Sequence, residues 1–326
     1  MAELTYRDAV ARGIAQEMAR DEDVVFLGED VAAAGGVFKT TVGLLEQFGP
    51  KRVRDTPISE QAIMGAAMGA AMTGLKPIAE IMFSDFFAVC FDYLANEMPK
   101  LRYMTGGQVT VPLVVRTANG GGLGFGAQHS QAVENWTLAI PGLKIVAPSN
   151  PADVIGLMAS AVRSEDPVVF FEHKGLFASK GAAAPDGHVV PLGQASTARE
   201  GTDLTVVALA ATVPMALAAA DLVAASDGIS AEVIDLRCLV PLDMAAVLAS
   251  VGKTSRLLIV EENPYQGGWG GTVASIVADE GFELLDAPVR RVAAACVPLP
   301  FADTLEQQVI PTVDAVATAV RKLMAY

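Results

Sequence analysis

The chain is poor in several residue types, and each shortage removes a class of function. Its 326 residues include three histidines and three cysteines, and 23 Lys and Arg stand against 37 Asp and Glu, which gives a net charge of −14. Nucleic acids and anionic membrane surfaces both require basic patches, so this charge argues against both partners. Cys90, Cys238 and Cys296 are far apart and odd in number, which predicts neither a disulfide framework nor a zinc site. They indicate a reducing cytoplasm.

Long apolar runs and nucleotide-binding or hydrolase motifs are also missing. The chain begins MAELTYRDAV, with acids early and no apolar signal core. Leu204–Ala220 is nearly uncharged, but its alanines and Pro214 predict a buried strand followed by a helix that starts near Pro214, not a membrane span. No P-loop, HExxH or G-x-S-x-G motif occurs. With 52% hydrophobic and 18% charged residues, the chain can bury a large core and a subunit interface.

What the sequence does contain is a regular alternation of strand and helix patterns. Short apolar segments separated by helices predict α/β domains with parallel sheets covered on both faces. The helices include Tyr6–Arg20 and Pro151–Arg163, the second with Asn150 as N-cap, and a last helix around Asp314–Met324. A Gly/Ala/Pro-rich stretch at 176–200 predicts a linker between domains at 1–175 and 201–326. The predicted strands are Val24–Leu27, Pro77–Met82, Leu113–Val115, Lys144–Ala147, Val168–Phe171, Leu204–Leu209, Glu232–Leu236 and Leu257–Glu261.

Glu60 is the first candidate for chemistry. It begins a helix that is almost devoid of charge, and apolar surroundings disfavour a charged carboxylate, which suits the group to proton transfer. The alternative is that Ser59 caps the helix and Glu60 complements the helix dipole. Spacing alone favours this alternative, because acids at helix starts are common. The same helix carries Gly65 and Gly69, and such small residues allow another helix to approach closely or serve ordinary core packing.

His129 is the second candidate, because it follows the glycine-dense segment NGGGLGFGAQHSQ. Such a loop permits close backbone approach to a ligand, and histidine can move protons near neutral pH. A lone loop histidine is, however, more often incidental. The loop also matches a relaxed G-x-G-x-x-A pattern at Gly122, Gly124 and Ala127, but no helix opens at its end and no acid ends the next strand. These absences argue against a dinucleotide site.

Several segments, taken together and in order, resemble a known family over essentially the whole chain. They are GED (28–30), RDTPISE (54–60), GAAMTGLKPIAEIMF (69–83), RYMTGG (102–107), AQHSQ (127–131), PGLKIVAPSNPADV (141–154), PVVFFEHK (167–174), EVIDLRCLVPLD (232–243) and VPLPFADTLE (297–306). This combination resembles the β subunits of the thiamine diphosphate-dependent first components of pyruvate, branched-chain 2-oxoacid and acetoin dehydrogenases. The resemblance implies a pyrimidine-binding domain followed by a smaller transketolase C-terminal-type domain.

The resemblance also implies partners and a cofactor. The β subunit joins an α subunit in an α2β2 heterotetramer, and thiamine diphosphate lies at their interface. The α subunit holds Mg²⁺ and the diphosphate through a Gly-Asp-Gly stretch with a later Asn, an arrangement that this chain lacks. A second component, a lipoyl-bearing acetyltransferase, takes the acetyl group. The chain is thus expected to be inactive alone.

Site residues carry over by position. Glu60 matches the glutamate that hydrogen-bonds a ring nitrogen of the aminopyrimidine, and Phe86 matches an aromatic against that ring, with a core aromatic as its alternative. Ile58 and Met82 are expected to line the same pocket. His129 matches a histidine that stabilises intermediates and helps acyl transfer to the lipoyl group. No metal site is expected on this chain.

The substrate is less well defined. EIMFSDFF, AQHSQ and FEHK are similar to acetoin dehydrogenase β subunits, AQHSQ also occurs in pyruvate dehydrogenases, and EENPYQGGWGG at 261–271 departs from the acetoin pattern. Acetoin and pyruvate remain nearly level, with branched-chain 2-oxoacids third. The further alternatives are half of a split transketolase or deoxyxylulose phosphate synthase, and a non-catalytic scaffold. Arg102 and Arg116 alone at 102–131 argue against a sugar phosphate, and the presence of Glu60 and His129 argues against a scaffold.

Overall fold

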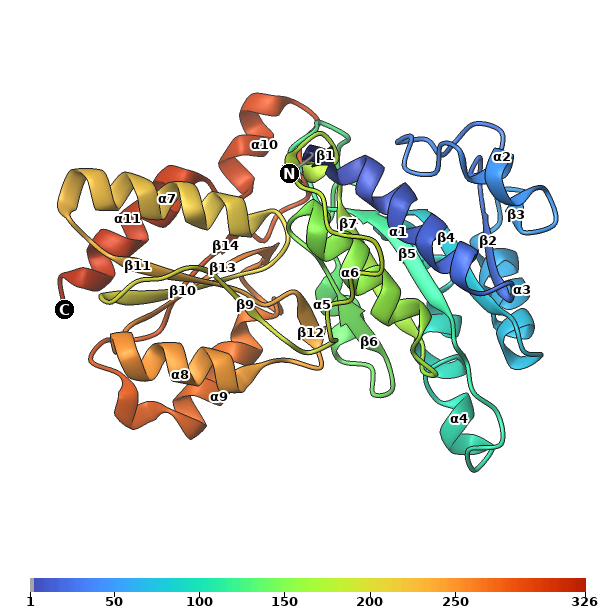
Figure 1. Cartoon of the computed structure of the whole chain (residues 1–326). Coiled ribbons are helices and arrows are strands. Elements are labelled where there is room, and N and C mark those ends of the chain that lie inside the picture. The colour runs from blue at the N-terminus through green and yellow to red at the C-terminus, as the bar shows by residue number, and fades with distance from the viewer. Residues whose placement is uncertain (1–2) are drawn as a thin grey trace. The chain divides into compact units, whose positions relative to one another are not determined.

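The chain forms two compact units (Figure 1). The computed structural model describes residues 3–326. The first unit runs to Asn119 and resumes over Trp136–Leu192, and the second consists of Gly120–Asn135 and Gly193–Tyr326. Residues 120–135 therefore group with the second unit, although they lie between two stretches of the first along the chain. The domain division at 1–175 and 201–326 remains a proposal, and its linker, 176–200, contains two short strands.

A parallel sheet is the centre of the first unit, as the alternating pattern predicts. Its strands follow the order β6-β7-β5-β4-β2-β3, and every neighbouring pair in this order is parallel. All residues of β5 and β7 are buried, so both faces of the sheet are covered there. The strands of this unit are β1 (Glu3–Thr5), β2 (Val24–Gly28), β3 (Val53–Asp55), β4 (Lys76–Phe83), β5 (Val114–Asn119), β6 (Lys144–Val146), β7 (Val168–His173) and β8 (Lys180–Ala182), of which β8 pairs antiparallel with β1.

Two helices of the first unit, α1 and α6, pack together over this sheet. A Cβ on Gly13 would lie 3.3 Å from Cα of Ile155, which shows how closely they approach. The Asn150 side chain caps α6 as predicted and accepts from the Asp153 amide at 3.0 Å, and Thr5 caps α1 by accepting from the Asp8 amide at 3.1 Å. The helices are α1 (Tyr6–Arg20), α2 (Leu44–Phe48), α3 (Glu60–Met72), α4 (Leu101–Met104), α5 (Glu134–Leu138) and α6 (Pro151–Val162), with shorter helical turns at η1 (Ser84–Ala88), η2 (Tyr93–Glu97) and η3 (Lys174–Leu176).

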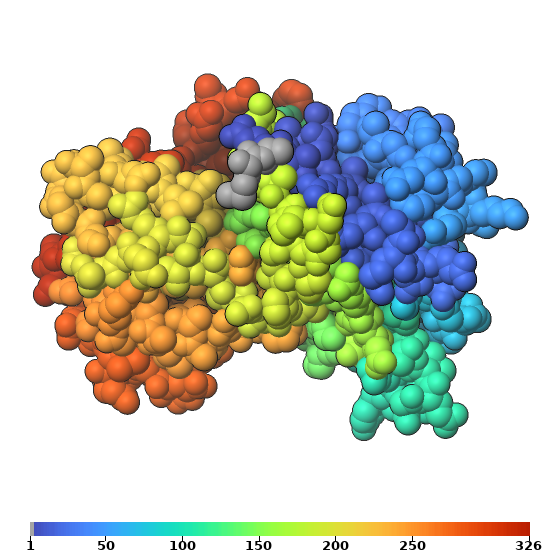
Figure 2. Space-filling view, in the orientation of Figure 1, coloured from blue at the N-terminus to red at the C-terminus, as the bar shows by residue number. Residues whose placement is uncertain are grey.

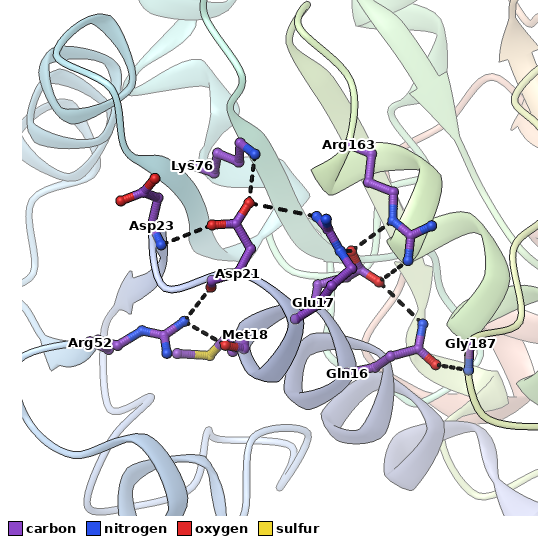
Figure 3. A network of polar contacts seen from close by, with 10 residues as sticks. Gln16, Glu17, Met18, Asp21, Asp23, Arg52, Lys76, Arg163 and Gly187 are labelled. Carbon is purple, nitrogen blue, oxygen red and sulfur yellow. Dashed lines mark hydrogen bonds and ion pairs between the residues drawn. The ribbon is translucent and has the colours of Figure 1, made fainter.

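A network of hydrogen bonds and ion pairs connects the C-terminal end of α1 to Arg163, Lys76 and Arg52 (Figure 3). The fully buried carboxylate of Glu17 accepts two hydrogen bonds from Arg163, at 2.9 and 2.7 Å, and one from Arg20 at 2.8 Å. Asp21 accepts from Lys76 at 2.6 Å, and Arg52 donates to the Asp21 carbonyl at 2.8 Å. These charged groups join α1 to the residue that follows α6 and to the start of β4.

The segment around α4 extends away from the body of the first unit, at the lower right of Figures 1 and 2. Tyr103 and Met104 lie on it and are 89% and 73% exposed. Large apolar side chains that stay this exposed on a folded unit are typical of surfaces that bind another protein.

The second unit contains a smaller sheet with helices on both faces. Its strand order is β14-β13-β10-β11-β9, parallel except where β9 joins β11. Helices α7 and α11 lie together on one face, and α8 and α9 lie on the other (Figure 1). The elements are β9 (Ser196–Arg199), β10 (Leu204–Ala208), α7 (Thr212–Asp227), β11 (Ala231–Asp235), β12 (Cys238–Val240), α8 (Met244–Thr254), β13 (Leu257–Pro264), α9 (Gly270–Glu280), η4 (Phe282–Leu284), β14 (Arg290–Ala294), α10 (Asp303–Val309) and α11 (Val313–Met324).

The apolar stretch Leu204–Ala220 forms a strand and a helix, as predicted, and the helix begins at Thr212, two residues before Pro214. Thr212 fixes this earlier start, because its hydroxyl accepts from the Leu209 amide at 3.0 Å and donates to the Val260 carbonyl at 2.9 Å. Over residues 3–326, no helix has the length and apolarity needed to cross a bilayer.

Candidate active site

The parallel sheet of the first unit has a point at which the direction of strand addition reverses, between β2 and β4. The chain passes from β2 outward to β3, then through α3 to β4 on the opposite side of β2. In open α/β sheets, ligands bind at the carboxyl ends of the strands that flank such a reversal. Glu29 directly follows β2, Met82 lies near the end of β4, and Glu60 begins α3.

Glu60 is buried at this position, with 9% of its surface exposed. Ser59 occupies the N-cap position but its side chain makes no capping hydrogen bond, so capping by Ser59 does not explain the local sequence. Burial, with the negative charges of Glu60 and Asp30, raises the pKa of Glu29. Burial, with the negative charge of Glu60, also raises the pKa of Cys90 to about 12. The Glu60 carboxyl group therefore acts on groups that follow β2 and η1.

Three apolar candidates lie near the same strand ends and differ in exposure. Phe86, in η1, is half-buried and contacts Phe83 edge-on with ring centroids 5.6 Å apart. Met82 is half-buried, and Ile58, two residues before Glu60, is 84% exposed. Partly exposed apolar side chains of this kind suit contact with a flat heterocycle.

A buried ionic cluster that the sequence patterns did not predict joins β4, β5 and β7. Arg116 on β5 donates to Glu172 on β7 at 2.8 and 2.5 Å, to Thr40 at 3.0 Å, and to Glu80 on β4. Burial, with the charges of Glu172 and Glu29 and against that of Arg116, raises the pKa of Glu80 to about 7. A charged residue inside each of three apolar strands was the available signal, because such residues are retained in cores when they pair.

His129 lies in the second unit, in a turn at 127–129 after the glycine-rich segment. It is half-buried, and its amide donates to the Gly126 carbonyl at 3.3 Å. The loop closes where the Gly120 amide donates to the Gln131 carbonyl at 3.0 Å. Gly122, at φ +87°, and Gly124, at φ +68°, have backbone conformations that favour glycine, which explains the composition of the segment.

The amides of this loop are already bound by carboxylates. Glu306 accepts from the Gly122 amide at 2.9 Å and from the Gly124 amide at 3.0 Å, and Glu262 accepts from Gly121 at 2.6 Å. These amides do not face outward to hold a pyrophosphate. The structure thus agrees with the argument against a dinucleotide site in the G-x-G-x-x-A segment. Across residues 3–326, no group of three or more His, Cys, Asp or Glu side chains is arranged to hold a metal ion.

The two halves of the chain match two known domain families. Residues 2–180 match the transketolase pyrimidine binding domain, and residues 193–316 match the transketolase C-terminal domain. A solved structure described as a split-gene transketolase, inactive β4 tetramer, is similar with a TM-score of 0.80 and 26% identity over 99% of this chain and 98% of that one. The expectation of a pyrimidine-binding domain followed by a transketolase C-terminal-type domain is therefore confirmed.

Characterised relatives of similar identity have three different substrates in their names. The chain is 45% identical to the β subunit of acetoin:2,6-dichlorophenolindophenol oxidoreductase of Bacillus subtilis (strain 168), over 98% of this chain and 97% of that one. It is 44% identical to the 2-oxoisovalerate dehydrogenase β subunit of the same organism, over both chains in full. It is 44% identical to the pyruvate dehydrogenase E1 component β subunit of Rickettsia felis, over 99% of each. The chain belongs to the transketolase-like family of β subunits of thiamine diphosphate-dependent 2-oxoacid and acetoin dehydrogenases.

Proposed function

We propose that this chain is the β subunit of a cytoplasmic dehydrogenase that cleaves acetoin or decarboxylates pyruvate and passes the acetyl group to lipoamide on a second component. The observation that carries the proposal is the buried Glu60 carboxyl group at the head of α3, whose charge acts on Glu29 directly after β2. The 2-oxoisovalerate dehydrogenase relative supports branched-chain 2-oxoacids as a second candidate substrate. Identities of 45%, 44% and 44% do not separate these substrates.

The residues present fit the aminopyrimidine end of thiamine diphosphate. In the proposal, Glu60 holds a proton at a ring nitrogen, Phe86 lies against the ring, and Ile58 and Met82 supply apolar contacts. When bound, the cofactor supplies the nucleophilic carbon and the electron sink that the reaction requires. The Glu60 carboxyl group is buried at the head of α3, which keeps bulk water from competing for its proton.

The diphosphate end fits this chain poorly. Glu29, Asp30 and Glu60 gather acidic groups near the strand ends. Burial is the larger cause of the raised pKa of Glu29, and the negative charges of Glu60 and Asp30 add to it. A diphosphate beside them would be repelled in the same way. This charge distribution supports the proposal that an α subunit holds the diphosphate and Mg²⁺, within an α2β2 heterotetramer.

His129 is proposed to act in acyl transfer to the lipoyl group of the acetyltransferase component. Its loop is rich in glycine, half-buried at the histidine and exposed at Leu123 and Phe125, which are 49% and 41% exposed. Such a surface is compatible with contact by the lipoyl arm.

The test is to co-express this chain with the α subunit encoded beside it and to measure reduction of an artificial electron acceptor. Acetoin, pyruvate and branched-chain 2-oxoacids are supplied in turn with thiamine diphosphate. Activity that requires both chains is expected, and the preferred substrate identifies the complex. A stable, cofactor-bound complex that is inactive on all three but turns over sugar phosphates would contradict the proposal. That result would support the split transketolase or deoxyxylulose phosphate synthase alternative, to which the 0.80 TM-score neighbour belongs in fold.

A further inference from the structure

A buried glutamate from the C-terminal half of the chain holds the middle of the glycine-rich loop. Glu306, on α10, is 2% exposed, and its two carboxylate oxygens accept from different amides, Gly122 at 2.9 Å and Gly124 at 3.0 Å. A Cβ on Gly121 would lie 3.1 Å from Glu306 Oε1 and 3.3 Å from the Ser130 carbonyl oxygen. The carboxylate and the loop therefore fit tightly, and no larger residue is accommodated there without a shift.

The two ends of the same loop are held by β13, in the same unit. Glu262 accepts from the Gly121 amide at 2.6 Å. On the far side of His129, the Asn263 side-chain amide donates to the Ala132 carbonyl at 2.8 Å and to Glu134 at 2.9 Å. Two consecutive residues of one strand thus fix both ends, and Glu306 fixes the part between them.

The carboxylate at position 306 matches the geometry of the loop. Gly122 and Gly124 have positive φ angles, which turns their amides towards the same point. The two amides bond to different oxygens of Glu306, and a carboxylate supplies both oxygens without a competing donor. Hydrogen bonds to a charged acceptor are also stronger than neutral ones, and more so when buried.

We propose that Glu306 is a positioning residue for the reaction: it fixes the glycine-rich loop and, through it, the place of His129. Gly124 is five residues before His129, and the His129 amide is bonded back to Gly126 at 3.3 Å, so motion of the glycines carries to the histidine. Glu306 itself touches backbone amides and acts through them. The functional part of this inference rests on the proposed role of His129 in acyl transfer.

The test compares Glu306→Gln, Glu306→Ala and His129→Ala in the co-expressed complex, with Glu280→Gln as control. Glu280 is exposed at the end of α9, so its variant makes the same chemical change away from the loop. Hydrogen exchange over residues 120–131 should be faster in both Glu306 variants by roughly 10- to 100-fold, because a buried charged hydrogen bond is lost. Reduction of the artificial acceptor should be retained, while acetyl transfer to lipoamide falls as it does in His129→Ala.

Unchanged exchange in both Glu306 variants would overturn the inference. Faster exchange together with normal acetyl transfer in the Glu306 variants would also overturn the inference, provided that His129→Ala is impaired in acetyl transfer. If His129→Ala itself transfers normally, the proposed role of His129 fails, and the exchange result alone decides whether Glu306 fixes the loop. Should the Glu306 variants fail to fold, Glu262→Gln offers a milder test, because it removes the acceptor of the Gly121 amide from the half-buried Glu262. Faster exchange confined to Gly121, with Gly122 and Gly124 still protected, supports a separate hold by Glu306, and equal loss of protection at all three amides contradicts it.

Discussion

At the scale of single residues, the carboxyl groups near β2 and β4 influence one another's protonation. Glu60 raises the pKa values of Glu29 and Cys90, although burial is the larger cause for both, and Glu29 in turn raises the pKa of Glu80. The negative charge of Glu60 therefore affects the protonation of neighbouring groups as well as its own proposed contact with the cofactor.

Replacing this charge gives the first prediction. Glu60→Gln should leave the assembled complex folded and reduce its turnover by about 10²–10⁴-fold, because an amide cannot carry the proton that general acid–base catalysis requires. Loss of the negative charge should also lower the pKa of Glu29. Acceptor reduction measures the turnover, and thermal unfolding of the complex checks that the variant stays folded. Glu46→Gln is the matched control, since Glu46 is an exposed acid in the first turn of α2. Turnover like that of the wild type in Glu60→Gln would remove this residue from the mechanism.

The second prediction concerns Glu80, whose pKa burial raises from 4.5 to about 7. Between these pH values the folded state binds a proton that the unfolded state has released. The protonated Glu80 side chain therefore makes its full contribution to the free energy of unfolding below pH 4.5, and this contribution is lost as the pH rises through about 7. Glu80→Gln cannot titrate, so its free energy of unfolding should lack this decline. Urea unfolding at several pH values measures the free energy of unfolding of wild type and variant. The difference between the two should change between pH 4.5 and about pH 7. A difference that stays constant would contradict the assignment.

At the scale of secondary-structure elements, most of the strands and long helices could be predicted from the sequence, and the reasons are local. Tyr6–Arg20 forms a helix over the predicted range because its apolar residues recur at helical spacing, and Asn150 caps the helix that begins at Pro151, which ends one residue earlier than predicted. Short strands such as β8 and β9 escaped prediction, because their residues are exposed or half-buried and carry no apolar pattern. Pairing with distant strands determines such segments, and pairing is not a local property.

The candidate site was predictable to a different extent. Resemblance to the family singled out Glu60, Phe86 and His129, but composition and spacing alone favoured ordinary structural roles for Glu60 and His129. The Glu80–Arg116–Glu172 cluster and the contact of Glu306 with the loop depend on residues 36 to 184 positions apart, which no local pattern records. Contacts between residues this far apart in the sequence can be identified only once the three-dimensional structure is known.

The third prediction belongs to the packing of α1 against α6. Burial alone would raise the pKa of Glu17, but hydrogen bonds from Arg163, Arg20 and Gln16 bring it below its ordinary value. The carboxylate then stabilises the fold above its unfolded pKa, and the contribution is lost as the pH falls through the folded pKa. Glu17→Gln should cost about 1–3 kcal/mol near neutral pH, because charged hydrogen bonds are removed from a buried acceptor.

Urea unfolding at neutral and acidic pH checks this. The deficit of Glu17→Gln should shrink as the pH falls below 4.5, while Glu22→Gln, a change at an exposed acid just beyond α1, should show little deficit at any pH. An equal effect of the two substitutions would show that Glu17 contributes no more than an exposed acid does.

At the scale of the whole molecule, one face of α3 is unlike the rest of the first unit. Gly65 packs within the unit, where a Cβ would lie 2.7 Å from the Tyr93 hydroxyl, whereas a Cβ on Gly69 would meet nothing within 4 Å. Ala62, Ala66 and Gly69 are exposed and share one helical face. The two glycines therefore differ in role. Gly65 serves core packing within the chain, and Gly69 lies on a surface that a neighbouring subunit can approach closely.

The fourth prediction follows from this difference. Gly69→Leu should leave the isolated fold intact, since leucine favours a helix more than glycine does. It should weaken assembly with the α subunit, because the side chain fills a surface proposed to lie in a subunit contact. Sedimentation velocity of the co-expressed chains measures the oligomer. Gly69→Ala is the control, with better helix propensity and almost no added bulk. An undisturbed oligomer with leucine would place this face outside the interface.

The membership of residues 120–135 in the second unit has a consequence for recombination between relatives. A chimera that joins the first part of one homologue to the second part of another at the obvious boundary, near residue 192, takes the glycines and Glu306 from different parents. The hydrogen bonds of Gly122 and Gly124 to Glu306 would then depend on two sequences that never evolved together. Exchanges that carry residues 120–135 along with the C-terminal segment keep these partners matched, and they define the natural breakpoints for building hybrids with altered substrate preference.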